Sequence, residues 1–264
     1  MKIIGLIYRY LRYLRKAKTK YHVHSPFVYD FIVKVLQDKS HYDAYDTVSA
    51  LRKELSRNYS PIEMIDFGSG AGKSKYKTRF RKVNDIARRT AQPPKFSRLL
   101  YRLVNYYQPR QIMELGTSLG LSTTSLALGN RNAYITTMEG CAGAASLARE
   151  NFDNIGLENI RIIIGNFDQA LPDFLKKDQQ PLGMVFFDGN HRKEPTINYF
   201  NQCLERVNNE SFFVFDDIHW SAEMEEAWEY IKTKEEVSIT IDLFNLGIVF
   251  FRKDIAKQNF ILRF

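Results

Sequence analysis

Three aspartates and a histidine in the second half of the chain stand where apolar runs end. Asp188 follows "GMVFF", and the pair Asp216-Asp217 follows "SFFVF". If these runs are strands of one doubly wound sheet, the three carboxylates converge at its carboxyl edge, where ligands bind. Either a bound Mg²⁺ or a raised carboxylate pKa must relieve such a cluster. His191 comes three residues after Asp188, and an imidazole with an unperturbed pKa of about 6.5 can accept a proton at neutral pH.

Two glycine-rich stretches, residues 64–72 ("MIDFGSGAG") and 114–120 ("ELGTSLG"), each suggest a cofactor loop. Such a loop must lead into a helix, and a second strand must then end in an acid that binds a ribose. Only the later stretch is followed by a helix-like segment and then by "AYITTME", which ends in Glu139. Gly116 and Gly120 are four residues apart, unlike the G-x-G-x-x-G spacing of dinucleotide-binding loops. We therefore place the cofactor at the later stretch, and interpret the earlier one as a flexible loop near the active-site mouth or as a tight turn without a ligand.

The elements that must position these residues form an α/β pattern from residue 110 onward. Five apolar runs alternate with helix-length segments, as in a parallel sheet covered on both faces. The last two runs, "VSITIDLF" and "GIVFF", are separated by the short turn Asn245-Leu246. Because a parallel crossover needs a dozen or more residues, these two runs must form an antiparallel hairpin.

The motifs "ELGTSLGLS", "TMEG", "GNF", "FFDGNH" and "FDDIHW", in this order within residues 108–252, resemble class I S-adenosylmethionine-dependent methyltransferases. Within that class they look like the metal-dependent O-methyltransferases of the catechol and macrolide-sugar types. The resemblance implies a Rossmann-like sheet of seven strands whose last hairpin is antiparallel. It also implies methylation of a hydroxyl on a small or sugar-like acceptor. Residues 1–107 would then be a mainly helical accessory segment that caps the substrate, and residues 108–264 the cofactor-binding domain.

The same resemblance assigns roles to individual residues. Glu139 would bind the ribose hydroxyls and Glu114 would orient the loop. Asn166 would donate to the adenine and Phe167 would pack against it, although the wider family commonly has an acid where Asn166 stands. The full predicted cofactor set is Glu114, Gly116, Thr117, Ser118, Gly120, Ser122, Glu139, Gly140, Asn166, Phe167 and Asp188.

Metal binding and catalysis are assigned in the same way. Asp188, Asp216 and Asp217 would bind Mg²⁺ or another divalent cation; the catechol-type family has an Asp-Asn pair at the second position, and macrolide-sugar relatives resemble the Asp-Asp form. His191 stands where the catechol-type family has its lysine base, so His191 and Asp188 are the predicted catalytic residues. Lys193 is the substitute candidate for the base, and His219, beside the Asp pair, would instead line the acceptor pocket with Trp220.

The composition indicates a globular chain with an unevenly distributed charge. Two cysteines give no disulfide framework, and no apolar run approaches the roughly 20 residues that span a bilayer, so we expect a cytoplasmic protein. Of the 264 residues, which carry a net charge of +8, residues 1–20 hold seven Lys or Arg and no acid. This segment is predicted to be an amphipathic basic helix. It would dock on the body or on a second subunit, the interpretation we favour, or lie on an anionic membrane surface, which would make the protein peripheral to the inner membrane face.

A second basic segment, residues 73–102, holds eleven Lys or Arg with Asp85 as its only acid. Its interleaved aromatics, Tyr76, Phe80, Phe96 and Tyr101, raise the alternative of a nucleic-acid methyltransferase. Against this, families that methylate base amines carry a Pro-Pro-aromatic motif where this chain has "DGNH". The other alternative is a non-catalytic module that binds a membrane or a partner.

Overall fold

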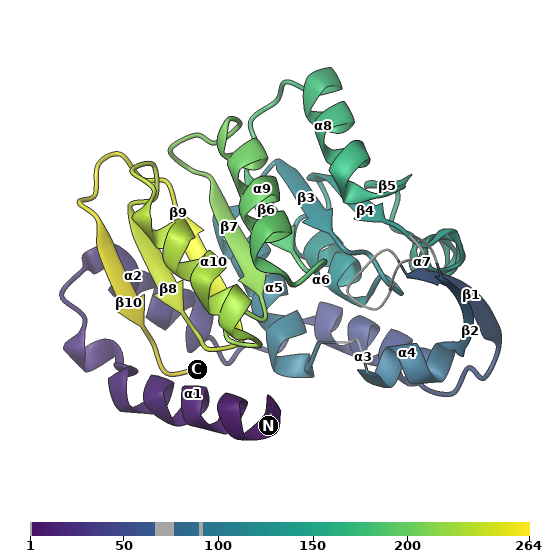
Figure 1. The fold of residues 1–264 in the computed structure, drawn as a ribbon, viewed down its shortest axis with the longest axis horizontal. Helices are drawn as coiled ribbons and strands as arrows, with labels where there is room; N and C mark the ends of the chain where they lie inside the picture. Colours follow the sequence, from purple (N-terminus) through teal and green to yellow (C-terminus); the bar gives the residue numbers. More distant parts are fainter. Residues whose placement is uncertain (1, 67–76, 90–91) are drawn as a thin grey trace. The chain divides into compact units, whose positions relative to one another are not determined.

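The computed structural model describes residues 2–66, 77–89 and 92–264 (Figure 1). The chain forms two compact units, one of residues Lys39–Lys177 and one that combines Met1–Asp38 with Asp178–Phe264. Neither unit ends at residue 107. The division predicted there was drawn from motifs rather than from packing, and it stays a prediction.

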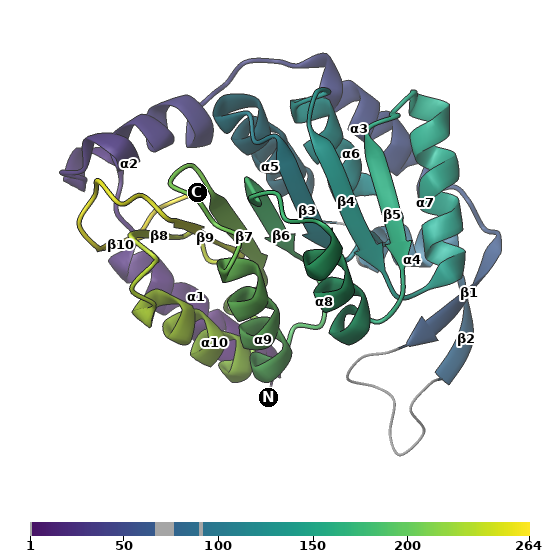
Figure 2. The ribbon, with the colours of Figure 1, turned by 90° about the horizontal axis from the view of Figure 1, so that it is seen from above.

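The unit Lys39–Lys177 contains three parallel strands, β3, β4 and β5, which lie side by side (Figure 2). A separate antiparallel hairpin, β1–β2, packs through β1 on α7. The elements are α3 (Asp43–Leu55), β1 (Pro61–Asp66), β2 (Lys77–Lys82), α4 (Val83–Arg89), α5 (Pro94–Tyr107), β3 (Gln111–Leu115), α6 (Leu121–Gly129), β4 (Tyr134–Glu139), α7 (Ala142–Ile155), β5 (Ile160–Ile164) and α8 (Phe167–Lys177).

The other unit contains five strands in the order β10-β8-β9-β7-β6. Its strand β9 is antiparallel to both β7 and β8, whereas β6 is parallel to β7 and β10 is parallel to β8. The elements are α1 (Lys2–Lys16), a 3₁₀ turn (Lys20–His22), α2 (Pro26–Phe31), a π-helical turn (Ile32–Leu36), β6 (Met184–Phe187), α9 (Lys193–Leu204), β7 (Phe212–Asp216), α10 (Ala222–Thr233), β8 (Ile239–Asp242), β9 (Leu246–Phe250) and β10 (Gln258–Ile261).

The predicted fold class is confirmed. Parallel strands alternate with helices, and the predicted terminal hairpin is the antiparallel pair β8–β9. The hairpin closes where the Leu243 amide donates to the Leu246 carbonyl at 2.9 Å. Strand β10 was not predicted, because it is only four residues long, begins with two polar residues, and pairs with β8 through a tertiary contact.

The phenylalanines of β6 and β7 form a dense core in their unit. Phe186, Phe187, Phe213 and Phe215 are all buried, and the rings of Phe187 and Phe215 stack with centroids 4.5 Å apart and planes 7° apart. Burial on both faces is typical of central parallel strands. This packing gives the residues that follow the two strands a rigid base.

Two of the four aromatics of the basic segment 73–102 are closed to stacking. Phe96 and Tyr101 on α5 are buried, and therefore cannot stack on nucleic-acid bases, whereas Phe80 on β2 is exposed. Tyr76 and the glycines of "DFGSGAG" lie outside the described residues, and the strand β1 ends at Asp66, before them. Among the described helices, none has the length and apolarity needed to cross a membrane.

Candidate functional site

The loop between β3 and α6 uses backbone conformations that favour glycine. Gly116 has φ 114°, Ser118 φ 48° and Gly120 φ 84°. A Cβ at Gly120 would lie 2.5 Å from Cε1 of Phe152, so only glycine fits there without displacing that ring. The predicted strand–glycine loop–helix is therefore present, with the loop held against β4 by the Gly116 and Thr117 amides, which both donate to the Met138 carbonyl.

Glu139, at the end of β4, faces this loop. Its carboxylate accepts from the amides of Ser118 and Cys141, each at 2.8 Å. Burial raises the pKa of Glu139, and hydrogen bonds from the amides of Cys141, Ser118 and Gly140 oppose that rise. Each carboxylate oxygen has a second lone pair, so the group can still accept from a hydroxyl. Its role in binding a ribose stays a prediction.

Glu114 lies fully buried at the centre of a threonine network. Its Oε2 accepts from the hydroxyls of Thr123 and Thr137, and Thr137 is 2.6 Å from the Thr117 hydroxyl. Since Thr137 donates to the carboxylate, Thr117 must donate to Thr137. Oε1 has no hydrogen-bond partner within the described part of the chain, although Ser122 lies near enough to lower the pKa.

Burial nevertheless raises the pKa of Glu114 to about 7. Neither Thr123 nor Thr137 was among the residues predicted for the site. The signal for Thr137 is its register, because Thr137 pairs directly with Glu114 across β3 and β4. Thr123 follows Gly120 by three residues on α6, so its hydroxyl reaches back to the strand that precedes the loop.

Asn166 and Phe167 follow β5, the third parallel strand of the unit. The Asn166 side-chain oxygen accepts from the Asp168 amide at 3.0 Å and so starts α8. Phe167 is the first residue of that helix, and both side chains are half-buried. The carboxamide oxygen is thus used locally, which leaves the Nδ2 group as the donor that the predicted adenine contact requires.

In the other unit, the ends of β6 and β7 bring together Asp188, Asp216 and His191. One ligand atom from each lies within 4.8 Å of the others, and Nε2 of His191 is 3.8 Å from Oδ1 of Asp188. Asp217, predicted as the third ligand, is not in this group. The backbone is left-handed at Asp217, where φ is 55°, and at Asn190, where φ is 54°. Asn190 directly precedes His191.

Asp217 instead interacts electrostatically with His191. Burial lowers the pKa of His191, and the Asp217 charge opposes this; burial raises the pKa of Asp217, and His191 opposes that. We infer that the imidazole is neutral at neutral pH. The two carboxylates can hold a divalent cation, and their oxygen ligands suit Mg²⁺ and Mn²⁺.

His219 does not have the accessible role that the sequence suggested for it. It is buried, and its two ring nitrogens contact Oε1 of Glu225 at 2.7 Å and Oδ2 of Asp242 at 2.8 Å. Because carboxylates only accept, both nitrogens must donate, and the ring is an imidazolium. Its ring also stacks on Phe244. Both nitrogens are thus committed to a structural cluster and are not available to bind an acceptor.

Comparison with known proteins identifies the domain. Residues 113–218 match a family described as methyltransferase domain, and this range includes both the glycine loop and the Asp188 cluster. Catechol O-methyltransferase from Niastella koreensis is 29% identical over 127 residues, which are 47% of this chain and 57% of that protein. Residues 113–218 therefore correspond to a methyltransferase domain. The resemblance predicted from the motifs is confirmed, while the matched region spans little more than half the length of that relative.

Solved structures share the fold of the methyltransferase domain. The O-methyltransferase from Bacillus cereus, in complex with SAH, is 17% identical, covers 85% of this chain and 97% of its own, and has a TM-score of 0.56. TomG from Streptomyces achromogenes, an O-methyltransferase in complex with SAM, is 18% identical, with coverages of 85% and 95% and a TM-score of 0.57. At these identities the likeness establishes the fold.

Proposed function

We propose that this chain transfers the methyl group of S-adenosylmethionine to a hydroxyl of a small or sugar-like acceptor, with help from a divalent cation. The observation that carries the proposal is the carboxylate of Glu139, which the amides of Ser118 and Cys141 hold against the glycine loop. An acid at the end of the second strand, facing such a loop, is placed to accept from a ribose diol.

Each part of the cofactor would bind to a different group in the unit Lys39–Lys177. Glu139 accepts from the ribose hydroxyls with its remaining lone pairs. Glu114 Oε1, which lacks a hydrogen-bond partner among the described residues, offers an acceptor to the amino group of the cofactor. Asn166 and Phe167 would contact the adenine. S-adenosylmethionine supplies an electrophilic methyl group bonded to a cationic sulfur.

The acceptor hydroxyl would be activated at the cluster of Asp188, Asp216 and His191. Asp188 and Asp216 would hold the cation, and a cation bound there would lower the pKa of the acceptor hydroxyl. His191, 3.8 Å from Asp188, would take the hydroxyl proton. One nitrogen cannot bind a cation and accept a proton at once, so the proposal assigns the ligand role to the two carboxylates and the base role to the imidazole.

Calorimetric titration with S-adenosylmethionine and S-adenosylhomocysteine tests cofactor binding. We expect micromolar binding by the wild-type chain and none by Glu139→Ala. Glu150→Ala removes an exposed carboxylate from α7 and serves as the matched control. Wild-type affinity in Glu139→Ala would remove the observation on which the proposal rests.

A second titration, with Mg²⁺ and with Mn²⁺ against the apoprotein, tests the cation site separately. The wild type should show a heat of cation binding, and Asp188→Asn should not. Asp173→Asn, which changes an exposed carboxylate on α8, is the control and should keep this heat. Turnover is measured with catechol and simple sugars as probe acceptors. His191→Ala should reduce turnover by about 10²- to 10⁴-fold at unchanged cofactor affinity; an unchanged rate would exclude His191 as the base.

A further inference from the structure

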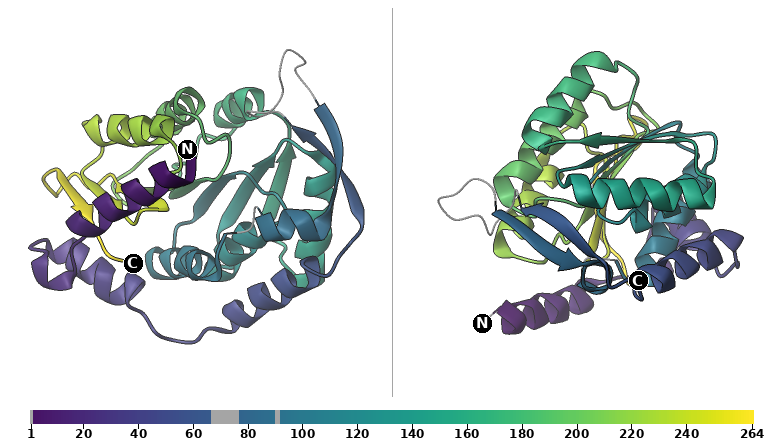
Figure 3. Two further views of the ribbon diagram at one scale, coloured as in Figure 1. Left: turned by 60° about the horizontal axis from the view of Figure 1, so that its bottom comes forward. Right: turned by 90° about the vertical axis from the view of Figure 1, so that its right-hand side faces the viewer.

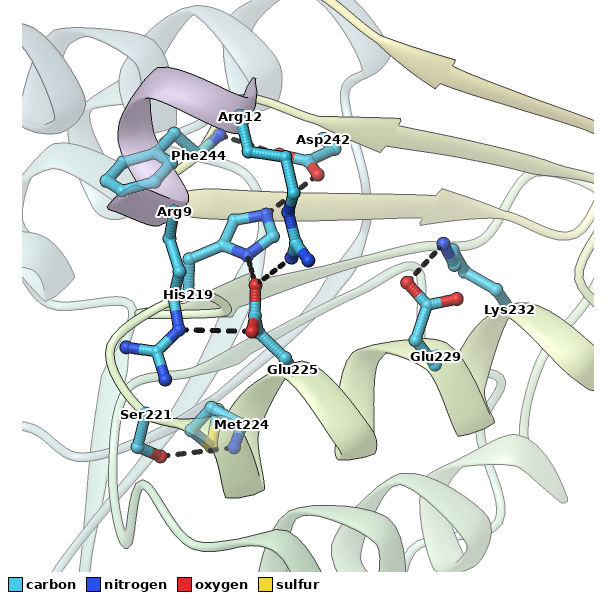
Figure 4. Close-up of polar contacts among 10 residues, drawn as sticks. All are labelled: Arg9, Arg12, His219, Ser221, Met224, Glu225, Glu229, Lys232, Asp242 and Phe244. Atoms are coloured by element: carbon cyan, nitrogen blue, oxygen red, sulfur yellow. Dashed lines mark hydrogen bonds and ion pairs between the residues drawn. The ribbon is translucent and has the colours of Figure 1, made fainter. Parts of the chain in front are cut away.

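The inner face of α1 is anchored to the body of its own unit by charge. Nε of Arg9 lies 3.0 Å from Oε2 of Glu225, and Nη2 of Arg12 lies 2.5 Å from Oε1 of the same side chain (Figure 4). Glu225 also contacts His219, which in turn contacts Asp242. Two acids thus face three cationic groups, and this partly buried, hydrogen-bonded arrangement fixes the rotation of α1 about its axis.

Aromatic packing reinforces the anchor. The rings of Tyr10 and Tyr13 lie 4.9 and 5.4 Å from the ring of Phe244, and the buried Tyr13 hydroxyl donates to the Leu262 carbonyl. Immediately after the helix, the Lys18 amide donates to the Ile261 carbonyl, so the chain runs beside β10 (Figure 3, left). The helix therefore docks on the body, which was the favoured sequence interpretation.

The opposite face of α1 carries apolar side chains outward. Ile7, Tyr8 and Leu11 are 54%, 68% and 55% exposed, and their spacing places them in one stripe along the helix. Arg15, four residues after Leu11, lies on the same side of the helix and is exposed, and Lys16 is exposed at the end of the last turn. Apolar side chains rimmed by cations are characteristic of helices that lie in a membrane interface.

We propose that this stripe binds an anionic membrane surface. Ile7, Tyr8 and Leu11 would enter the headgroup region while Arg15 and Lys16 contact lipid phosphates. Charge complementarity favours this occupant over a second copy of the chain, because a symmetric contact would oppose two segments that each hold seven Lys or Arg and no acid. The negative charge of Glu225 faces Arg9 and Arg12, so it does not neutralise Arg15 or Lys16.

Co-sedimentation of the full chain with vesicles tests the proposal. The vesicles contain phosphatidylcholine alone or phosphatidylcholine with about 30% phosphatidylserine, which gives them a strong negative surface potential. Binding should require phosphatidylserine and weaken as salt rises from about 0.1 M, where the Debye length is about 10 Å. Arg15→Gln/Lys16→Gln should lower the partition coefficient about 25-fold, at about fivefold per charge. Arg131→Gln, an exposed charge elsewhere, should leave it unchanged.

A second pair of variants separates insertion from simple charge attraction. The double variant Ile7→Ser/Leu11→Ser should lower the partition coefficient at least about tenfold, because it lacks the aliphatic side chains that leave water when the stripe enters the headgroup region. Ile164→Ser, on β5 and 55% exposed, is the matched control. Thermal melting checks that every variant is folded.

Three results would overturn the proposal. The first is equal binding to vesicles without phosphatidylserine, and the second is wild-type binding by Ile7→Ser/Leu11→Ser. The third is absence of vesicle binding together with a dimer in sedimentation that Ile7→Ser/Leu11→Ser dissociates. That result would assign the stripe to a second copy of the chain. None of these readouts depends on methyl transfer, so the test is independent of the proposed function.

Discussion

Replacing Gly120 by alanine should destabilise the methyltransferase domain through two separable effects. The first is backbone strain, because φ at this residue is 84°, a conformation that L-residues rarely adopt. The second is a clash, because the new Cβ would lie 2.5 Å from Cε1 and 2.8 Å from Cζ of Phe152. Phe152 is buried on α7 and has little room to move.

The two effects have different sizes. Strain of this kind costs about 1 kcal/mol, and overpacking of a core about 1–3 kcal/mol. We therefore expect Gly120→Ala to lose about 3 kcal/mol of unfolding free energy, or about 9 °C in Tm at about 3 °C per kcal/mol for a chain of this size.

Gly156→Ala is the matched control, because Gly156 has φ 71° and a Cβ added there would meet no atom within 4 Å. It carries the strain without the clash and should lose only about 1 kcal/mol. The assay is urea denaturation of both variants, repeated in a Phe152→Leu background that lacks the clashing ring atoms. Equal losses in the two glycine variants, or no relief of Gly120→Ala by Phe152→Leu, would refute the steric argument.

Three further predictions concern buried titratable groups. Burial lowers the pKa of His219, but the hydrogen bonds and charges of Asp242 and Glu225 raise it more, so its net pKa is above the ordinary value. The stabilising contribution of His219 should therefore be complete below about pH 6.5 and be lost as pH rises through the folded pKa. Urea denaturation of the wild type and of His219→Gln should show this loss as a falling difference in unfolding free energy. Parallel pH profiles of the two proteins would contradict the prediction. Burial raises the pKa of Glu114 to about 7, so wild-type stability relative to Glu114→Gln should fall by about 3 kcal/mol between about pH 4 and pH 8; a flat difference would argue against a buried, charged carboxylate. Cys203 is fully buried and burial raises its pKa, so a thiol reagent should label it only after denaturation, and rapid native labelling would show that this core opens.

The fold class and the cofactor loop could be read from the sequence because both depend on local patterns. Apolar runs of strand length, alternating with helical segments, indicate a parallel sheet whatever their partners are. A glycine loop between a strand and a helix is specified by a few adjacent residues, and the acid of Glu139 follows on the next strand. The hairpin β8–β9 was predictable because Asn245-Leu246 leaves room for no other connection.

The membership of the acidic cluster was not predictable in this way. Asp217 is adjacent to Asp216, so sequence position could not separate them, and His191 was assigned as a base rather than as a neighbour of both carboxylates. Left-handed backbone at Asp217 and Asn190 sets where the side chains go. Such conformations are held by the surrounding structure rather than by the residue itself, which is why no local pattern revealed them.

By itself, then, the sequence determined the α/β class, the strand–loop–helix around Gly116 and Gly120, and the amphipathic character of residues 1–20. Only the tertiary structure decided which side of α1 faces outward, because that depends on Glu225, a residue 213 positions after Arg12. It also decided that Asp188, Asp216 and His191 converge, and that His219 is structural. Periodicity and glycine placement are properties of neighbouring residues, whereas these contacts join segments that meet only when the chain has packed.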